Sequence, residues 1–216
     1  CSQLKENICA IAADLLDCKP DELEFAGRAV RKIVGTGEVS LFDIATRSMC
    51  GNITAVEATA SHSSPISPPP FMVGMVEIEL DRETGQVDVL DYAAVVDCGT
   101  PVNPNLARVQ TEGGIVQGIG MALYEDVTYE PTGRIMENSF MQYKIPTRLD
   151  MGKLRVEFES SYEQTGPFGA KSIGEIVINT PSPALAHAIA HATGVWHREL
   201  PITPEKVLRA IQKGQE

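Results

Sequence analysis

The strongest structural signal in the chain is the sequence Val76-Glu77-Ile78-Glu79-Leu80-Asp81-Arg82-Glu83-Thr84-Gly85-Gln86-Val87-Asp88-Val89. Apolar and polar residues alternate on both sides of a turn-forming segment at 81–85. This is the pattern of a β-hairpin. The returning strand extends to residue 97, and a turn-rich loop over 98–104 follows it. The pattern therefore predicts an antiparallel pair of strands over 76–97.

A helix is predicted over 105–124, directly after this hairpin. Residues that recur at steps of three and four predict a buried stripe on it: Leu106, Val109, Gly113, Val116, Gly120 and Leu123. A neighbouring face carries Gln110, Gly114 and Gln117. Glutamine amides both donate and accept hydrogen bonds, and glycine leaves room beside them, so this face suits a polar heterocycle. The alternative is close helix packing on the glycines, with the glutamines in solvent.

The other elements follow from the same patterns. Helices are predicted over 2–18, 41–50 and 183–193 and from Pro204 onward; strands are predicted over 52–61 and 154–158, and hairpins over 23–30 and 127–145. The proline-rich segment 62–70 is either a domain linker or, as we favour, a loop that crosses a surface. The sequence thus predicts an α+β fold with mixed, hairpin-rich sheets, helices packed on one face, and two subdomains that meet near 62–70.

Composition excludes several classes of function. The net charge of −11 argues against nucleic-acid or anionic-membrane partners, because either would need a basic face. No apolar run approaches the roughly 20 residues that span a bilayer. The five cysteines are odd in number and form no C-x-x-C pair, which argues against a disulfide framework or an iron–sulfur site and favours reduced, cytoplasmic thiols. The chain starts at Cys1 inside a helical pattern, so we expect it to be part of something longer.

A second informative stretch is Gly166-Pro167-Phe168-Gly169-Ala170-Lys171-Ser172-Ile173-Gly174-Glu175. Its glycines and proline predict a tight loop, and the carboxylate at its end could act as a base. The alternative is a surface loop that happens to end in glutamate. His187 and His191 are four residues apart on a predicted helix, but neither the intervening glutamate nor a third ligand of a zinc site is present. No metal ligand is therefore predicted.

Six segments taken together resemble the molybdenum hydroxylases, the family of xanthine dehydrogenase and aldehyde oxidase. They are Val76–Asp81 with Thr84-Gly85, Asp97-Cys98-Gly99 with Asn103-Pro104, Gln110–Gly118, Tyr143–Pro146, Gly169–Glu175 and Leu200–Glu205. They occur in the family's order from about residue 70 to the end. The resemblance is to the C-terminal part of the molybdopterin-binding subunit, and the form of 170–175 is similar to that of bacterial xanthine dehydrogenases.

This resemblance implies a role for each part of the motifs. Glu175 would be the general base in a hydroxylation that takes its oxygen from water. Gln110 would hydrogen-bond the molybdopterin of the molybdenum cofactor. The other cofactor contacts implied are Gly113, Gly114 and Gln117 on the helix face, and Gly169, Ala170, Lys171 and Ser172 in the loop.

The resemblance also implies a substrate and partners. The expected substrate is a purine of the xanthine or hypoxanthine type. Aldehyde or other N-heterocycle oxidation, or a non-catalytic role in assembly, are the alternatives. A [2Fe–2S] cluster and FAD are expected on partner chains or domains. Because the family's other molybdenum-site loops are not in this chain, we expect the chain alone to be inactive.

Overall fold

The computed structural model describes residues 1–50, 56–61 and 63–213. These form two compact units, Cys1–Ser63 and Ser64–Glu216, so the division lies in the proline-rich segment 62–70. Gly51, the predicted end of the second helix, and His62 lie outside the described residues. So do residues 52–55 of the strand predicted over 52–61, and its described part, 56–61, contains no strand.

The first unit packs two helices and a small antiparallel sheet around one core. Its elements are α1 (Ser2–Leu16), β1 (Leu23–Ala26), β2 (Ala29–Lys32), β3 (Glu38–Ser40) and α2 (Leu41–Cys50), with a short 3-10 turn at Pro20–Glu22. The Ser40 hydroxyl accepts a hydrogen bond from the Asp43 N–H at 3.1 Å and donates one to its carboxylate at 2.6 Å. This reciprocal pair caps the helix start, as predicted. Both helices and the hairpin are confirmed, whereas β3 was not predicted.

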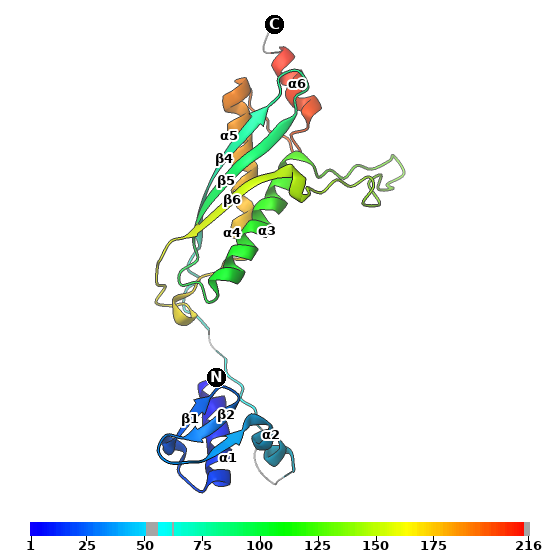
Figure 1. Cartoon of the computed structure of the whole chain (residues 1–216). Coiled ribbons are helices and arrows are strands. Elements are labelled where there is room, and N and C mark those ends of the chain that lie inside the picture. The colour runs from blue at the N-terminus through cyan, green and yellow to red at the C-terminus, as the bar shows by residue number, and fades with distance from the viewer. Residues whose placement is uncertain (51–55, 62, 214–216) are drawn as a thin grey trace. The chain divides into compact units, whose positions relative to one another are not determined.

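A mixed three-stranded sheet forms the framework of the second unit (Figure 1). β4 (Phe71–Leu80) pairs antiparallel with β5 (Val87–Asp97), and β5 pairs parallel with β6 (Met151–Phe158). The predicted hairpin is confirmed. Its turn closes because Gly85 adopts a positive φ of 77° and the Asp81 carboxylate accepts the Glu83 N–H at 2.8 Å.

Helices cover one face of this sheet, which confirms the predicted α+β class (Figure 1). They are α3 (Pro104–Leu123), the short α4 (Ile176–Asn179) and α5 (Pro181–Thr193), while α6 (Pro204–Lys213) follows near the end of the chain; 3-10 turns lie at Arg148–Asp150 and Pro167–Gly169. α5 packs against β4 and α3. Fully buried side chains from sheet and helices form the shared core, among them Tyr92, Ile115, Val156 and Leu185.

The hairpin-like unit predicted over 127–145 forms only around its turn at 130–133, where the Glu130 N–H donates to the Arg134 carbonyl and the Met136 N–H to the Thr128 carbonyl. A single β-bridge joins Tyr129 to Ile135, and the segment is otherwise a loop without regular structure, which Figure 1 shows extending away from the sheet. Among the described residues, no helix combines the length and the apolar character that crossing a bilayer requires.

The stripe predicted to be buried on α3 is wrong over its first half. Leu106 and Val109 are 66% and 63% exposed, and Gly113 is also exposed. Gly120 and Leu123 of the predicted stripe are buried. The other buried residues of the helix are Ala107, Thr111, Gly114, Ile115, Gly118, Ile119 and Ala122. Small residues lie on the buried face because α4 and α5 approach it closely: a Cβ on Gly114 would collide with the Val177 side chain, and one on Gly118 with Pro181. Close packing therefore decides which face is buried.

Candidate functional site

The loop over 166–175 carries the chain from the end of the β6 region to α4. Glu175 immediately precedes α4, and its side chain is exposed. Within the described part of the chain, its carboxylate has no hydrogen-bond or ion-pair partner. The predicted tight loop is confirmed: Gly169 has a φ of 81°, a conformation that favours glycine.

Backbone contacts hold the first half of this loop on the end of β5. The Lys171 N–H donates to the Cys98 carbonyl at 2.7 Å, and the Thr100 N–H donates to the Gly169 carbonyl at 2.8 Å. Gly99 has a φ of 66°, and a Cβ there would collide with the Gly169 carbonyl oxygen. A glycine at position 99 is thus required for the loop to lie this close.

A buried ion pair adds a side-chain contact at the same place. The Lys171 ammonium lies 2.6 Å from Asp97 Oδ2, and the two side chains are only 8% and 22% exposed. The other carboxylate oxygen of Asp97 accepts hydrogen bonds from the Ser161 hydroxyl at 2.6 Å and the Gly99 N–H at 3.0 Å. The hydrogen bonds from Lys171 and Ser161 lower the pKa of Asp97 to about 2. Asp97 is therefore ionised across the physiological range.

Gln110 holds the second half of the loop. Its side-chain NH₂ donates to the Gly174 carbonyl at 3.0 Å, one residue before Glu175. The glutamine is therefore not merely solvated, as the packing alternative supposed. No described residue donates to its amide oxygen, so this acceptor is available to a ligand.

Two hollows flank the Gln110–Gly174 contact, and both of these residues line each hollow. One, of about 790 Å³, is also lined by Gly113, Gln117 and Glu175. The other, of about 440 Å³, lies between the start of α3 and the loop and is lined in part by Ala170 and Lys171.

The structure therefore brings together only part of the predicted site. Gln110, Gly113, Gly114, Gln117 and Glu175 share the larger hollow, although Gly114 is buried and makes room for Val177. The four predicted contacts in the loop do not line the larger hollow. Gly169 and Lys171 are occupied by contacts within the protein, Ala170 reaches only the smaller hollow, and Ser172 is exposed and lines neither. Their contact with a cofactor stays a prediction.

Sequence reasoning gave no role to Asp97, although it belongs to a quoted motif. The signal that could have found it is an acidic residue at the end of a buried strand. A strand pattern alone does not reveal that this carboxylate meets Lys171, 74 residues later.

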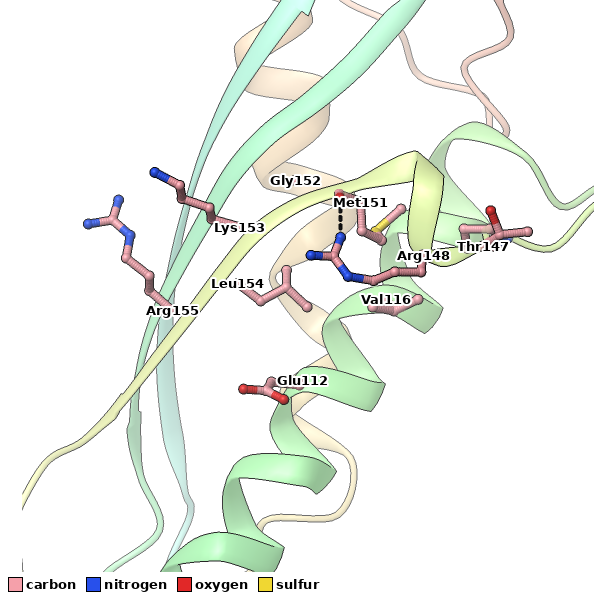
Figure 2. Close-up of a pocket in the computed structure, with 10 residues that line it drawn as sticks. Glu112, Val116, Thr147, Arg148, Met151, Gly152, Lys153, Leu154 and Arg155 are labelled. Carbon is pink, nitrogen blue, oxygen red and sulfur yellow. Dashed lines mark hydrogen bonds between the residues drawn. The ribbon is translucent and has the colours of Figure 1, made fainter.

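A third hollow, of about 690 Å³, lies between α3 and β6 and contains none of the predicted residues. Figure 2 shows Glu112 on α3 and Arg148 in the 3-10 turn before β6, where the guanidinium donates to the Met151 carbonyl at 2.6 Å. Among the described residues, no group of three or more His, Cys, Asp or Glu side chains could hold a metal ion. All five cysteines are free thiols.

Comparison with known proteins identifies a matching family and several relatives. The family described as the molybdopterin cofactor-binding domain matches residues 1–152, so Glu175 lies beyond the matched range. The chain is 37% identical over 179 residues to the probable hypoxanthine oxidase XdhD of Escherichia coli (strain K12), covering 82% of this chain and 19% of that protein. It is 35% identical over 212 residues to the gamma subunit of the 6-hydroxypseudooxynicotine dehydrogenase complex of Paenarthrobacter nicotinovorans, covering 94% and 27%.

A solved structure has a similar fold. Quinoline 2-oxidoreductase from Pseudomonas putida 86 matches with a TM-score of 0.72 and 27% identity, over 98% of this chain and 28% of that one. The chain therefore spans less than a third of the length of each of these proteins.

Proposed function

We propose that the chain supplies the general base of a molybdopterin-dependent hydroxylation. It belongs to the molybdopterin cofactor-binding domain family of the molybdenum hydroxylases. The observation that carries this proposal is the position of Glu175. Its exposed carboxylate lines the same hollow as the amides of Gln110 and Gln117, and the backbone before it is held by Gln110.

The lining of this hollow fits a pterin. A pterin ring presents alternating hydrogen-bond donors and acceptors, and an amide side chain can pair with both kinds of group. The amide oxygen of Gln110 can accept from such a ring, and Gln117, two turns along the helix, offers a second amide. A Cβ placed on Gly113 meets nothing within 4 Å, so a flat ligand has room on this face. Gln110, Gly113 and Gln117 would hold the cofactor.

Glu175 would perform the proton transfer. When bound, the molybdenum cofactor supplies the two-electron acceptor for the reaction. Overall, a substrate C–H and water become C–OH, two protons and two electrons. A carboxylate at the edge of the hollow can accept one of these protons, because a positioned carboxylate is one of the common general bases of enzymes. The electrons would leave through the iron–sulfur cluster and flavin of partner chains or domains.

The proposed substrate is a purine of the hypoxanthine or xanthine type. The 37% identity to a probable hypoxanthine oxidase supports this choice. An N-heterocycle of another kind is the second candidate, supported by the likeness to quinoline 2-oxidoreductase. Aldehyde oxidation would use the same chemistry. The cytoplasmic location expected from the cysteine content, like the partner subunits, belongs to this proposal.

The test is Glu175→Gln in the complete enzyme, purified from its own host with all its subunits. Removing a general base should lower kcat for hypoxanthine by about 100-fold or more, because glutamine cannot accept the proton. Molybdenum and pterin contents should stay as in the wild type. Glu157→Gln, an exposed glutamate on β6, is the matched control and should retain wild-type turnover.

Unchanged turnover of the Glu175→Gln enzyme would sink the assignment of the base and leave an assembly role for the domain. Quinoline and benzaldehyde, assayed beside hypoxanthine and xanthine, decide the substrate class. A higher kcat/KM for either of the first two would replace the purine proposal without affecting the base.

A further inference from the structure

We propose that Asp97 and Lys171 are positioning residues for Glu175, and that their ion pair, rather than contact with a cofactor, is the function of Lys171. This inference rests on the proposed function. It gives Lys171 a role different from the one its motif implies, because its ammonium lies on Asp97 and its side chain is only 8% exposed.

The Asp97–Lys171 ion pair is held in place by several contacts of Asp97. Asp97 is the last residue of β5 and pairs with Phe71 of β4, and the residue before it, Val96, is paired with both β4 and β6. Three donors from different parts of the chain converge on its carboxylate: the Lys171 ammonium, the Ser161 hydroxyl and the Gly99 N–H. Such a nearly buried pair is costly to break on one side, because the partner is left as an uncompensated charge.

Lys171 is also held by two further contacts. Its N–H donates to the Cys98 carbonyl at 2.7 Å, and its ammonium lies 5.4 Å from the centre of the Phe71 ring. Phe71 is the β4 residue paired with Asp97 in the sheet. Backbone, carboxylate and aromatic ring therefore fix this residue against the ends of two strands.

Glu175 is four residues further along. Among the residues that the structure describes, one other side chain makes a hydrogen bond to the segment between. This bond runs from Gln110 to the Gly174 carbonyl. Residues 172–175 therefore span two anchors, one on β5 and one on α3. Loss of the first anchor would let Glu175 shift, and a displacement of about 1 Å from a reactive geometry can cost about 100-fold in rate.

The experiment is a double-mutant cycle in the complete enzyme, with hypoxanthine as substrate. Its members are the wild type, Lys171→Met, Glu175→Gln and the double variant. We expect Lys171→Met to lower kcat by about tenfold or more, with little change in KM and with molybdenum and pterin retained. In the Glu175→Gln background, the same change should cause no further loss, because a misplaced base and an absent base are equivalent.

Two more variants complete the test. Asp97→Asn keeps an acceptor for Ser161 and Gly99 but loses the charge, and it should reproduce the Lys171→Met defect. Asp91 is on the same strand as Asp97 but forms an ion pair with Arg155 of β6. Asp91→Asn removes that pair and should retain wild-type turnover.

Each contrary outcome is distinct. Wild-type kcat in Lys171→Met, or a defect that multiplies with that of Glu175→Gln, would overturn the positioning role while leaving Glu175 as the base. Loss of folded protein or of molybdenum in both Lys171→Met and Asp97→Asn would overturn it too, since the pair would then serve assembly. Full turnover in Glu175→Gln alone would instead overturn the proposed function.

Discussion

At the scale of single residues, the Asp97 carboxylate should make stability depend on pH. Its pKa is lowered from 3.8 to about 2 in the folded protein, mainly by Lys171 and Ser161. The folded state therefore binds this proton less readily than the unfolded state does. The resulting stabilisation, about 2 kcal/mol, is fully present above pH 5 or so and is lost as the pH falls towards 2.

The measurement is urea unfolding of the wild type and Asp97→Asn between pH 7 and pH 3. The difference in unfolding free energy should be largest at neutral pH and should shrink towards pH 3, because other carboxylates titrate equally in both proteins. Asp91→Asn is the control: the Asp91 side chain is 17% exposed, close to the 22% of Asp97, but its partner Arg155 is 65% exposed, and a pair with a solvated cation contributes under about 1 kcal/mol. A difference independent of pH would show that Asp97 acts without its charge.

Individual residues of the candidate site were predictable only where a local sequence motif includes them. Glu175 follows from its place after a glycine-rich loop, and Gln110 from its spacing to Gln117 on a helix. The bond from Gln110 to Gly174 spans 64 residues and the Asp97–Lys171 pair spans 74, and no local pattern encodes either contact. The contact of Lys171 with Asp97 was consequently not predicted, and its contact with the cofactor stays a prediction.

At the scale of elements, the contact of α3 with α4 depends on a missing side chain. Gly114→Ala would place a Cβ against the Val177 side chain and within 3.3 Å of its backbone. Because Val177 lies in the first turn after Glu175, relief of the collision requires α4 to move. We expect a loss of about 1–3 kcal/mol in unfolding free energy, the usual cost of overpacking.

Gly113→Ala is the matched control, one position away on the same helix. It is exposed, and its added Cβ meets nothing within 4 Å, so it should raise stability by up to about 1 kcal/mol through helix propensity. Urea unfolding midpoints of the two variants check the pair. Equal midpoints would contradict the close packing of α3 on α4.

The same packing explains why helix positions were predicted better than helix faces. Steps of three and four placed α3 correctly, since period alone identifies a helix. They misplaced its buried side, because Leu106 and Val109 suggested a core that Gly114 and Gly118 form instead. Glycine has no side chain and does not count as a hydrophobic residue in such a pattern. A helix face that is buried because another helix packs closely on its glycines is therefore not predicted from hydrophobic periodicity.

At the scale of the whole molecule, the two units have separate cores. Buried apolar residues of the first lie between Ile11 and Ile44, and those of the second between Val87 and Ile211. The proline content of 62–70 is enough to predict a boundary there. That each unit has its own core depends on contacts between residues distant in sequence. Each unit should therefore survive cleavage of the segment that joins them.

Limited proteolysis tests this directly. Subtilisin, which has little sequence preference, should cut the intact chain between residues 63 and 70 and leave two resistant pieces. Trypsin is the control, because no Lys or Arg occurs between Arg47 and Arg82, so it cannot cut there whatever the local structure. The subtilisin pieces should separate on a sizing column and retain far-UV circular dichroism, since each buries its own apolar side chains. Pieces that stay together, or a second piece that is degraded at once, would show instead that one core stabilises the other.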